Sequence, residues 1–198
     1  MNSAPHQAHA APSAPLLEIR GAAKRYGTRQ VLDGISLTLA AGEAVALVGV
    51  NGAGKTTLLR ALLDLAHLDG GTVSIAGRAH TTPAARAALA FLGERFNPPA
   101  FASGHEYLRH LLALDGIACD AAAAVREAAA LELDAAALDA PLGTWSKGMA
   151  QKLGLIALIL AAKPLLVLDE PMSGLDPRAR ALVKARLQAL HAGGTALL

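Results

Sequence analysis

The chain has 198 residues, of which 53% are hydrophobic and only 3% aromatic, and its formal net charge is +2. This length suits one well-buried domain and is short for two independent ones. The net charge is too small to give the strong electrostatic footprint of a protein that binds DNA or RNA, so we expect no nucleic-acid partner. The scarcity of aromatic residues indicates a core of aliphatic side chains and alanine.

The start of the chain, its single cysteine and its most apolar stretch indicate in which cellular compartment the protein acts. Residues 1–15 mix Ala, Pro, Ser and His without the apolar run of a secretory signal, and they are predicted to form a disordered tail. A single cysteine, Cys119, excludes an intramolecular disulfide and fits a reducing compartment. The apolar stretch 153–162 reaches about half of the ~20 residues that a membrane-spanning helix needs. If the protein works at a membrane, we expect another chain to cross it.

The first part of the chain shows β-type patterns. Short apolar runs at 16–19 and 35–39, separated by glycine turn signals, predict antiparallel strands. The continuous apolar run 44–48 predicts a strand buried on both faces. It leads through a glycine-rich loop into a helical pattern over 55–63. The order strand, loop, helix is typical of phosphate-binding α/β proteins.

The rest of the chain alternates short apolar runs with longer helical patterns. We expect strands over 72–75, 165–168 and 195–198. We expect helices beginning at Pro83 and spanning 106–114, 121–133 and 177–191. Residues 96–163 are mostly helical and are predicted to form a helical subdomain inside one domain that covers 16–198 and stops within its last strand.

The glycine-rich loop, Gly-Val-Asn-Gly-Ala-Gly-Lys-Thr-Thr, matches the phosphate-binding pattern. Its glycines let backbone N–H groups close around a β-phosphate at a helix N-terminus. Lys55 is predicted to reach the β- and γ-phosphates and Thr56 to offer its hydroxyl to Mg²⁺. The predicted nucleotide-binding residues of this loop are Gly49, Asn51, Gly52, Ala53, Gly54, Lys55, Thr56 and Thr57. We therefore expect ATP and Mg²⁺ as ligands.

An acidic pair follows the apolar run 165–168. Asp169 and Glu170 stand at its C-terminal end, the usual place for ligand chemistry in a parallel sheet. Asp169 is predicted to hold Mg²⁺, directly or through water. Because side chains alternate along a strand, Glu170 is predicted to face differently and to deprotonate the attacking water. An apolar run ending in Asp-Glu is common by itself, and the phosphate loop upstream is what favours the catalytic interpretation.

Three more segments accompany these two motifs, and all five stand in the order seen in one protein family. Residues 145–152 resemble the signature loop of ATP-binding cassette (ABC) transporter ATPases in its Ser-x-Gly-x-x-Gln form, 173–176 resemble the loop after that family's acidic strand, and 24–27 resemble its adenine-stacking turn. The resemblance covers almost all of 16–198. It implies an α/β P-loop NTPase fold, with a RecA-like core containing a parallel sheet, an N-terminal antiparallel β-subdomain and an inserted α-helical subdomain.

The resemblance also implies roles for residues outside the two motifs. Tyr26 would stack on adenine, although a half-buried strand residue is the alternative. Ser146 and Gly148 would contact the nucleotide of a partner cassette in a head-to-tail dimer, because a serine hydroxyl and free N–H groups at a helix start form an anion site. Ser146 as an ordinary helix N-cap is the alternative, and it can be both.

Two departures from the family pattern bear on activity. Glu94 stands where the family usually has a glutamine that contacts Mg²⁺ and water, so it is predicted to be a catalytic and metal ligand, with a solvated loop residue as the alternative. The family's switch histidine follows a strand like 195–198, and the chain stops before that position. We therefore expect this chain to bind Mg²⁺ and ATP better than it hydrolyses ATP.

The function implied by the resemblance is that of an export-type ABC transporter ATPase. It would be a homodimer bound to a separate membrane permease at the cytoplasmic face of a bacterial membrane, with residues 96–114 docking the permease. A non-transport cassette acting on ribosomes or DNA is the second hypothesis, and the near-neutral charge and the single cassette disfavour it. A truncated nucleotide-binding module, inactive alone, is the third.

Overall fold

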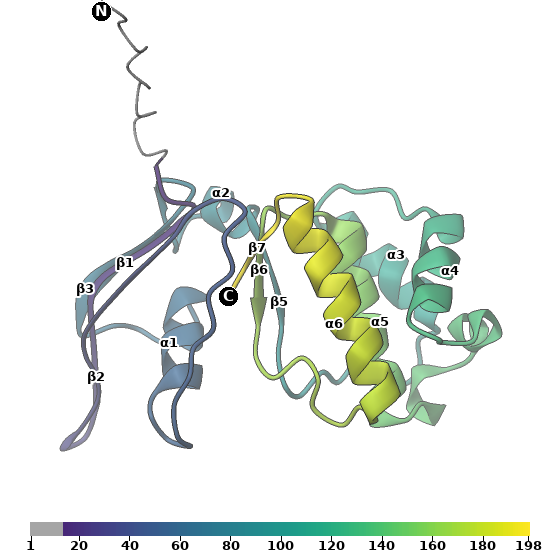
Figure 1. Ribbon diagram of the computed structural model, residues 1–198, viewed down its shortest axis with the longest axis horizontal. Coiled ribbons are helices and arrows are strands. Elements are labelled where there is room, and N and C mark those ends of the chain that lie inside the picture. The colour runs from purple at the N-terminus through teal and green to yellow at the C-terminus, as the bar shows by residue number, and fades with distance from the viewer. Residues whose placement is uncertain (1–13) are drawn as a thin grey trace, which may run out of the picture.

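The computed structural model describes residues 14–198, so the predicted tail lies almost wholly outside the described residues. An antiparallel sheet forms one end of the molecule, helix α1 (Lys55–Leu62) and a parallel sheet occupy the middle, and the helices of residues 104–192 form the opposite end (Figure 1). Over 14–198, none of the helices combines the length and the apolar character needed to cross a bilayer.

The antiparallel sheet contains β1 (Leu17–Tyr26), β2 (Arg29–Leu39), β3 (Gly70–Ile75) and β4 (Arg78–Ala79), in the order β2-β1-β3-β4. The strand predictions at 16–19, 35–39 and 72–75 are confirmed, although β1 and β2 are longer than the sequence indicates. One face of this sheet covers a core, and the buried side chains come from β1, β2 and β3. They are Leu17, Ile19, Ala22, Leu32, Leu39, Val73 and Ile75.

Gly71 in β3 lies where the chain passes close to β1. Its φ is +86°, and a Cβ there would lie 2.4 Å from the Gly21 carbonyl oxygen. We expect Gly71→Ala to lower the free energy of unfolding by about 2–4 kcal/mol, because strain at positive φ adds to a backbone clash. Urea denaturation measures the change. Gly77→Ala is the matched control, since Gly77 also has a positive φ but a Cβ there meets no described atom within 4 Å. Equal losses in the free energy of unfolding for the two variants would contradict the proposed clash.

The parallel sheet contains β5 (Leu89–Leu92), β6 (Leu165–Leu168) and β7 (Ala196–Leu197), with β6 in the centre. Side chains of β6 alternate between two cores. Leu165 and Val167 pack with the antiparallel sheet and α1, whereas Leu166 packs with the helices. The continuous apolar run is therefore explained by a strand buried on both faces, as predicted.

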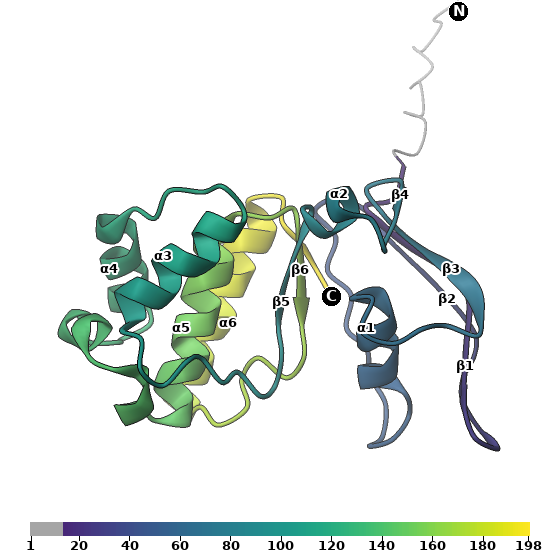
Figure 2. The same ribbon diagram turned by 180° about the vertical axis from the view of Figure 1, so that it is seen from behind.

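The helices on the other side of β5 and β6 form one packed layer (Figure 2). They are α3 (Gly104–Leu114), α4 (Ala121–Ala130), α5 (Lys147–Ala161) and α6 (Pro177–Ala192), with 3₁₀ turns at Ala135–Asp139 and Leu142–Thr144. Each α-helix of this layer begins after a side chain that accepts a hydrogen bond from a backbone N–H of the first turn, which satisfies a group the helix leaves unpaired. These N-cap residues are Ser103, Asp120, Ser146 and Asp176.

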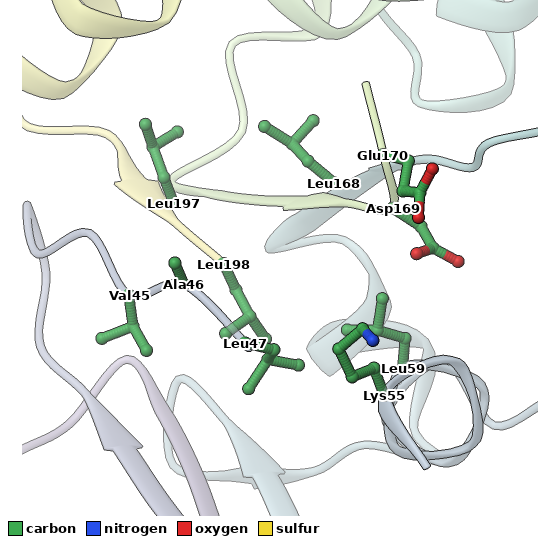
Figure 3. Close-up of a pocket in the computed structure, with 10 residues that line it drawn as sticks. All are labelled: Val45, Ala46, Leu47, Lys55, Leu59, Leu168, Asp169, Glu170, Leu197 and Leu198. Atoms are coloured by element: carbon green, nitrogen blue, oxygen red, sulfur yellow. The ribbon is translucent and has the colours of Figure 1, made fainter. Parts of the chain in front are cut away.

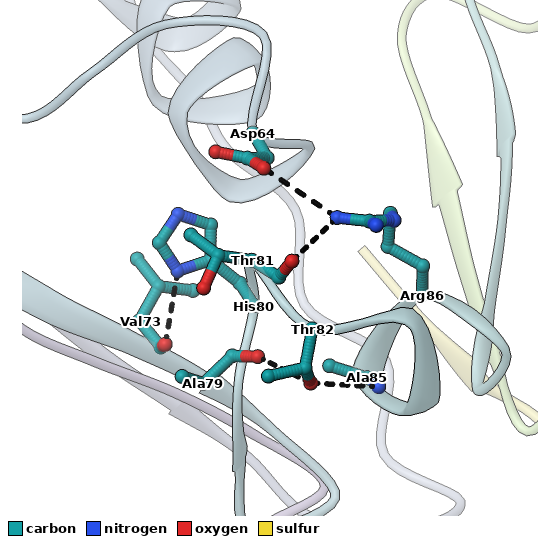
Figure 4. Close-up of polar contacts among 8 residues, drawn as sticks. All are labelled: Asp64, Val73, Ala79, His80, Thr81, Thr82, Ala85 and Arg86. Atoms are coloured by element: carbon teal, nitrogen blue, oxygen red, sulfur yellow. Dashed lines mark hydrogen bonds and ion pairs between the residues drawn. The ribbon is translucent and has the colours of Figure 1, made fainter.

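Short helix α2 (Pro83–Arg86) ties the end of α1 to the antiparallel sheet (Figure 4). Arg86 pairs with Asp64 at 3.4 Å and donates to the Thr81 carbonyl at 2.7 Å. Thr82 caps α2 by accepting from the Ala85 N–H at 3.3 Å. The Arg86–Asp64 pair is half exposed, so it contributes at most about 1 kcal/mol. The pair links the turn that follows α1 to helix α2.

The predicted strand over 44–48 is wrong. Ala44 forms one parallel bridge with Leu197, and the Val45 N–H donates to the Leu197 carbonyl at 2.9 Å, but the described residues give 46–48 no strand partner. A strand needs a neighbour that pairs with its backbone groups. Val48 is consequently 93% exposed. The space between this segment and β6 is an apolar groove of about 270 Å³ (Figure 3).

Candidate functional site

A cleft of about 560 Å³ gathers most of the predicted site residues from segments far apart in the sequence. The β1–β2 hairpin, the start of α1, the segment after β5 and the end of β6 all contribute. Its lining residues are Tyr26, Arg29, Val31, Asn51, Gly52, Gly54, Lys55, Thr56, Thr57, Glu94, Asp169 and Glu170. Gly49 and Ala53 belong to the loop but do not line the cleft.

The phosphate loop presents the N-terminus of α1 to this cleft. Gly54 precedes the helix with φ +94°, and a Cβ there would lie 2.8 Å from the Val31 carbonyl oxygen, so this position requires glycine. Glycine offers no side-chain cap, which leaves the first N–H groups of α1 available to an anion. Lys55 folds back over the loop and donates to the carbonyls of Gly49 at 2.6 Å and Val50 at 3.1 Å. Its ammonium is thus held by two carbonyls of the loop itself.

The predicted metal ligands Thr56 and Asp169 meet across the cleft. Thr56 Oγ1 lies 3.5 Å from Asp169 Oδ2, and both are hard oxygen ligands of the kind Mg²⁺ prefers. Among residues 14–198, no cluster of three or more His, Cys, Asp or Glu side chains could hold a metal alone. The Thr56 and Asp169 oxygens fit a Mg²⁺ that takes its other ligands from phosphate and water.

Glu170 faces the same cleft as Asp169, contrary to the expectation from strand alternation. Strand β6 ends at Leu168, so the period-2 rule does not extend to residue 170. Glu170 instead adopts φ +49°, a left-handed conformation that costs a non-glycine residue about 1–3 kcal/mol. Figure 3 shows the two carboxylates side by side, facing the start of α1, which carries Lys55.

Glu94 follows β5 and lines the cleft while its side chain stays exposed. Asp169 and Glu170 line the same cleft, and so do the cations Lys55 and Arg29. The role of Glu94 toward metal or water stays a prediction.

Ser146 and Gly148 lie at the start of α5 and do not line the cleft. Ser146 is an N-cap, because its Oγ accepts from the Met149 N–H at 3.2 Å. The neighbouring Lys147 donates to Ser173 Oγ at 3.0 Å. This bond joins the signature loop to the loop that follows the acidic strand, so the two loops form one surface. That surface stands apart from the phosphate loop of the same chain.

The sequence interpretation missed Arg29 and Val31, which line the cleft from β2. Arg29 pairs with Tyr26 across the hairpin, and its Nη2 donates to the Gly52 carbonyl at 3.2 Å. The signal was present in the sequence. A two-residue turn at 27–28 brings residue 29 beside Tyr26, and alternation along β2 then directs residue 31 to the same side.

These features define the class of protein to which the site belongs. A phosphate loop opens a helix, an acidic pair ends a parallel strand opposite it, and an aromatic side chain stands at the rim, which together make a nucleoside-triphosphate site of the P-loop NTPase kind. The family comparison is more specific. Residues 32–173 match the family model described as "ABC transporter". The chain belongs to the ABC transporter ATP-binding family, whose members are ATPases, and the predicted fold class is confirmed.

Relatives of known name support this assignment. The chain is 39% identical over 193 residues to a Nod factor export ATP-binding protein I of Burkholderia lata, covering 94% of this chain and 62% of that protein. It is 38% identical over 184 residues to the daunorubicin resistance ATP-binding protein DrrA2 of Streptomyces coeruleorubidus, covering 88% and 55%. The chain therefore spans about six-tenths of the length of these relatives.

Solved structures agree with the sequence relatives. An ATP-binding subunit of an ABC transporter superposes with a TM-score of 0.83 at 29% identity, over 92% of this chain and 78% of that one. A protein described as a putative ABC transporter ATP-binding protein from Pyrococcus furiosus gives 0.79 at 28% identity, over 91% and 88%. Both likenesses extend over more than nine-tenths of this chain.

Proposed function

We propose that this chain binds Mg²⁺ and ATP in the cleft, hydrolyses ATP there, and powers export through a separate permease at the cytoplasmic face of a bacterial membrane. One observation carries the proposal. The phosphate loop and the Asp169–Glu170 pair, more than a hundred residues apart, line one cleft in an orientation that can hold a triphosphate between them.

Each side chain has a defined task in this proposal. The N–H groups at the start of α1 and the Lys55 ammonium bind the β- and γ-phosphates, and Tyr26 stacks on the base. Thr56 and Asp169 hold Mg²⁺, which neutralises phosphate charge when it is bound. Glu170 accepts the proton of the attacking water, and Glu94 orients that water.

The second cassette supplies what the cleft lacks. In a head-to-tail homodimer, Ser146, Gly148 and the free N–H groups at the start of α5 would bind the γ-phosphate held by the partner. The support is positional, because Ser146 caps α5, Gly148 lies in its first turn, and neither residue lines the cleft of its own chain. ATP would then hold two chains together until hydrolysis separates them.

The direct test is phosphate release from Mg²⁺–ATP by the purified chain, alone and together with the membrane protein encoded beside its gene. We expect turnover that is stimulated by the membrane protein. ATP binding without turnover in both samples would overturn the catalytic assignment and favour a nucleotide-binding regulator.

A permease has a suitable docking surface on the helical layer. Phe101 is 89% exposed and, with its neighbours before and along α3, borders a hollow of about 440 Å³. Such an exposed aromatic ring is typical of an interface anchor. We expect Phe101→Ser to weaken permease binding at least roughly tenfold while ATP affinity is unchanged.

Affinity for the permease in detergent measures this effect. Leu114→Ser is the matched control, because Leu114 is 72% exposed at the other end of α3 and does not border the hollow. If both substitutions leave permease binding unchanged, the docking surface lies elsewhere. If both weaken it equally, the contact covers α3 and does not centre on Phe101.

A further inference from the structure

The adenine-stacking candidate Tyr26 does not stand alone at the end of β1. Lys24, two residues earlier, points to the same face of the strand, and its Nζ lies over the Tyr26 ring at 5.3 Å from the ring centroid. Lys24 Nζ also lies 2.9 Å from Asp69 Oδ1, and the lysine side chain is only 14% exposed. A lysine this well covered beside an aromatic face makes a cation–π contact that is stronger than one in open solvent.

Asp69, just before β3, binds this end of β1 through its side chain and its backbone. Its second carboxylate oxygen accepts from the Arg25 N–H at 2.7 Å, and its own N–H donates to the Ala23 carbonyl at 2.9 Å. The hydrogen bonds from the Arg25 amide and from Lys24 hold the pKa of Asp69 below its ordinary value. Asp69 is therefore ionised at neutral pH and can anchor both Lys24 and the backbone that precedes Tyr26.

We propose that Asp69 and Lys24 are positioning residues for the nucleotide base. Lys24, Tyr26 and Asp69 form what we call the base clamp. Asp69 holds Lys24 against one face of the Tyr26 ring, so the ring is fixed and the base of ATP stacks on its other face. This inference rests on the proposed stacking role of Tyr26.

The surroundings of the ring support a one-sided stack. Tyr26 borders the nucleotide cleft and also a second hollow of about 510 Å³, and Lys24 lines the second hollow but not the cleft. Thr56 and Thr57 of the phosphate loop line both hollows, and it is Lys24 Nζ, 5.3 Å from the ring centroid, that covers one face of Tyr26. Because Tyr26 is 51% exposed, its ring would otherwise lose rotamer freedom on binding the base, and a ring fixed in advance avoids that cost.

The test compares two ligands that share the phosphate site. ATP carries a base, whereas inorganic tripolyphosphate contacts only the phosphate loop. Loss of a residue that positions the base should therefore lower the affinity for ATP alone, whereas loss of a general structural residue should lower the affinity for both ligands. For Lys24→Met and for Asp69→Ala, we expect the Kd of ATP to rise about three- to tenfold and the Kd of tripolyphosphate to stay unchanged. The double variant should lose no more than either single one, since the two residues act as one unit.

Glu18→Gln is the matched control, because it removes the Glu18–Arg20 ion pair at 2.8 Å from the same strand, away from the ring. It should change neither affinity. Equal losses for both ligands in Lys24→Met, or no loss for ATP, would overturn the base clamp. Tyr26→Ala distinguishes failure of the base clamp from failure of the stacking role. If Tyr26→Ala lowers ATP affinity and the Lys24 and Asp69 variants do not, the base clamp is wrong and the stacking role of Tyr26 stands. If Tyr26→Ala has no effect on ATP affinity, the stacking role itself is wrong.

Discussion

Glu170→Gln is expected to lower kcat for ATP hydrolysis by about 10²- to 10⁴-fold, because the amide cannot accept the proton of the attacking water. The shape of the side chain is kept, so ATP affinity should stay within about threefold of the unchanged protein. Glu170 lines the cleft with Asp169 and is held there by its left-handed backbone, which glutamine can retain. Phosphate release and equilibrium ATP binding measure the two quantities separately.

Glu94→Gln is the informative comparison. It restores the residue type that the family usually has after this strand, and it keeps an oxygen that can contact metal or water. We expect its kcat to remain within about tenfold of the unchanged protein. If Glu94→Gln abolished turnover and Glu170→Gln did not, the roles of the two carboxylates would have to be exchanged.

Lys55→Ala is expected to weaken ATP binding by about 2–4 kcal/mol, or roughly 30- to 1,000-fold in Kd. The reason is the position of the ammonium, which donates to the Gly49 and Val50 carbonyls at the centre of the loop. Phosphate oxygens would replace these acceptors with charge-assisted hydrogen bonds that alanine cannot make. Titration calorimetry with Mg²⁺–ATP measures the change.

Lys184→Ala removes the same charge from the exposed face of α6 and serves as the control. It should leave the ATP affinity unchanged, since a single exposed charge far from the cleft is screened by salt. An unchanged affinity in Lys55→Ala would place the nucleotide outside this cleft.

Much of the fold could be predicted because its signals are local. The run 165–168 is a strand buried on both faces, and Pro83 and Pro177 each stand at the first position of a helix, as the sequence indicates. The segment 44–48 shows where local signals fail. Its apolar pattern is as clear as that of 165–168, but a strand also needs a partner, and the described residues pair only Ala44.

The parts of the site that are formed by contiguous sequence motifs could be predicted. The phosphate loop and the acidic pair are each readable in one stretch, and the structure places them in one cleft. The direction of Glu170 was predicted from strand alternation and differs, because β6 ends two residues earlier. Asp69 was missed because its link to Lys24 depends on the pairing of β1 with β3, which no local pattern near Asp69 reveals.

The most direct measurement is a crystal structure of this chain with Mg²⁺ and a non-hydrolysable ATP analogue. We expect the phosphates to be bound by the N–H groups at the start of α1 and by Lys55, and Mg²⁺ to lie between Thr56 and Asp169. We also expect the base on the face of Tyr26 opposite Lys24. A nucleotide bound in another hollow, or a metal bound away from Thr56 and Asp169, would contradict these expectations.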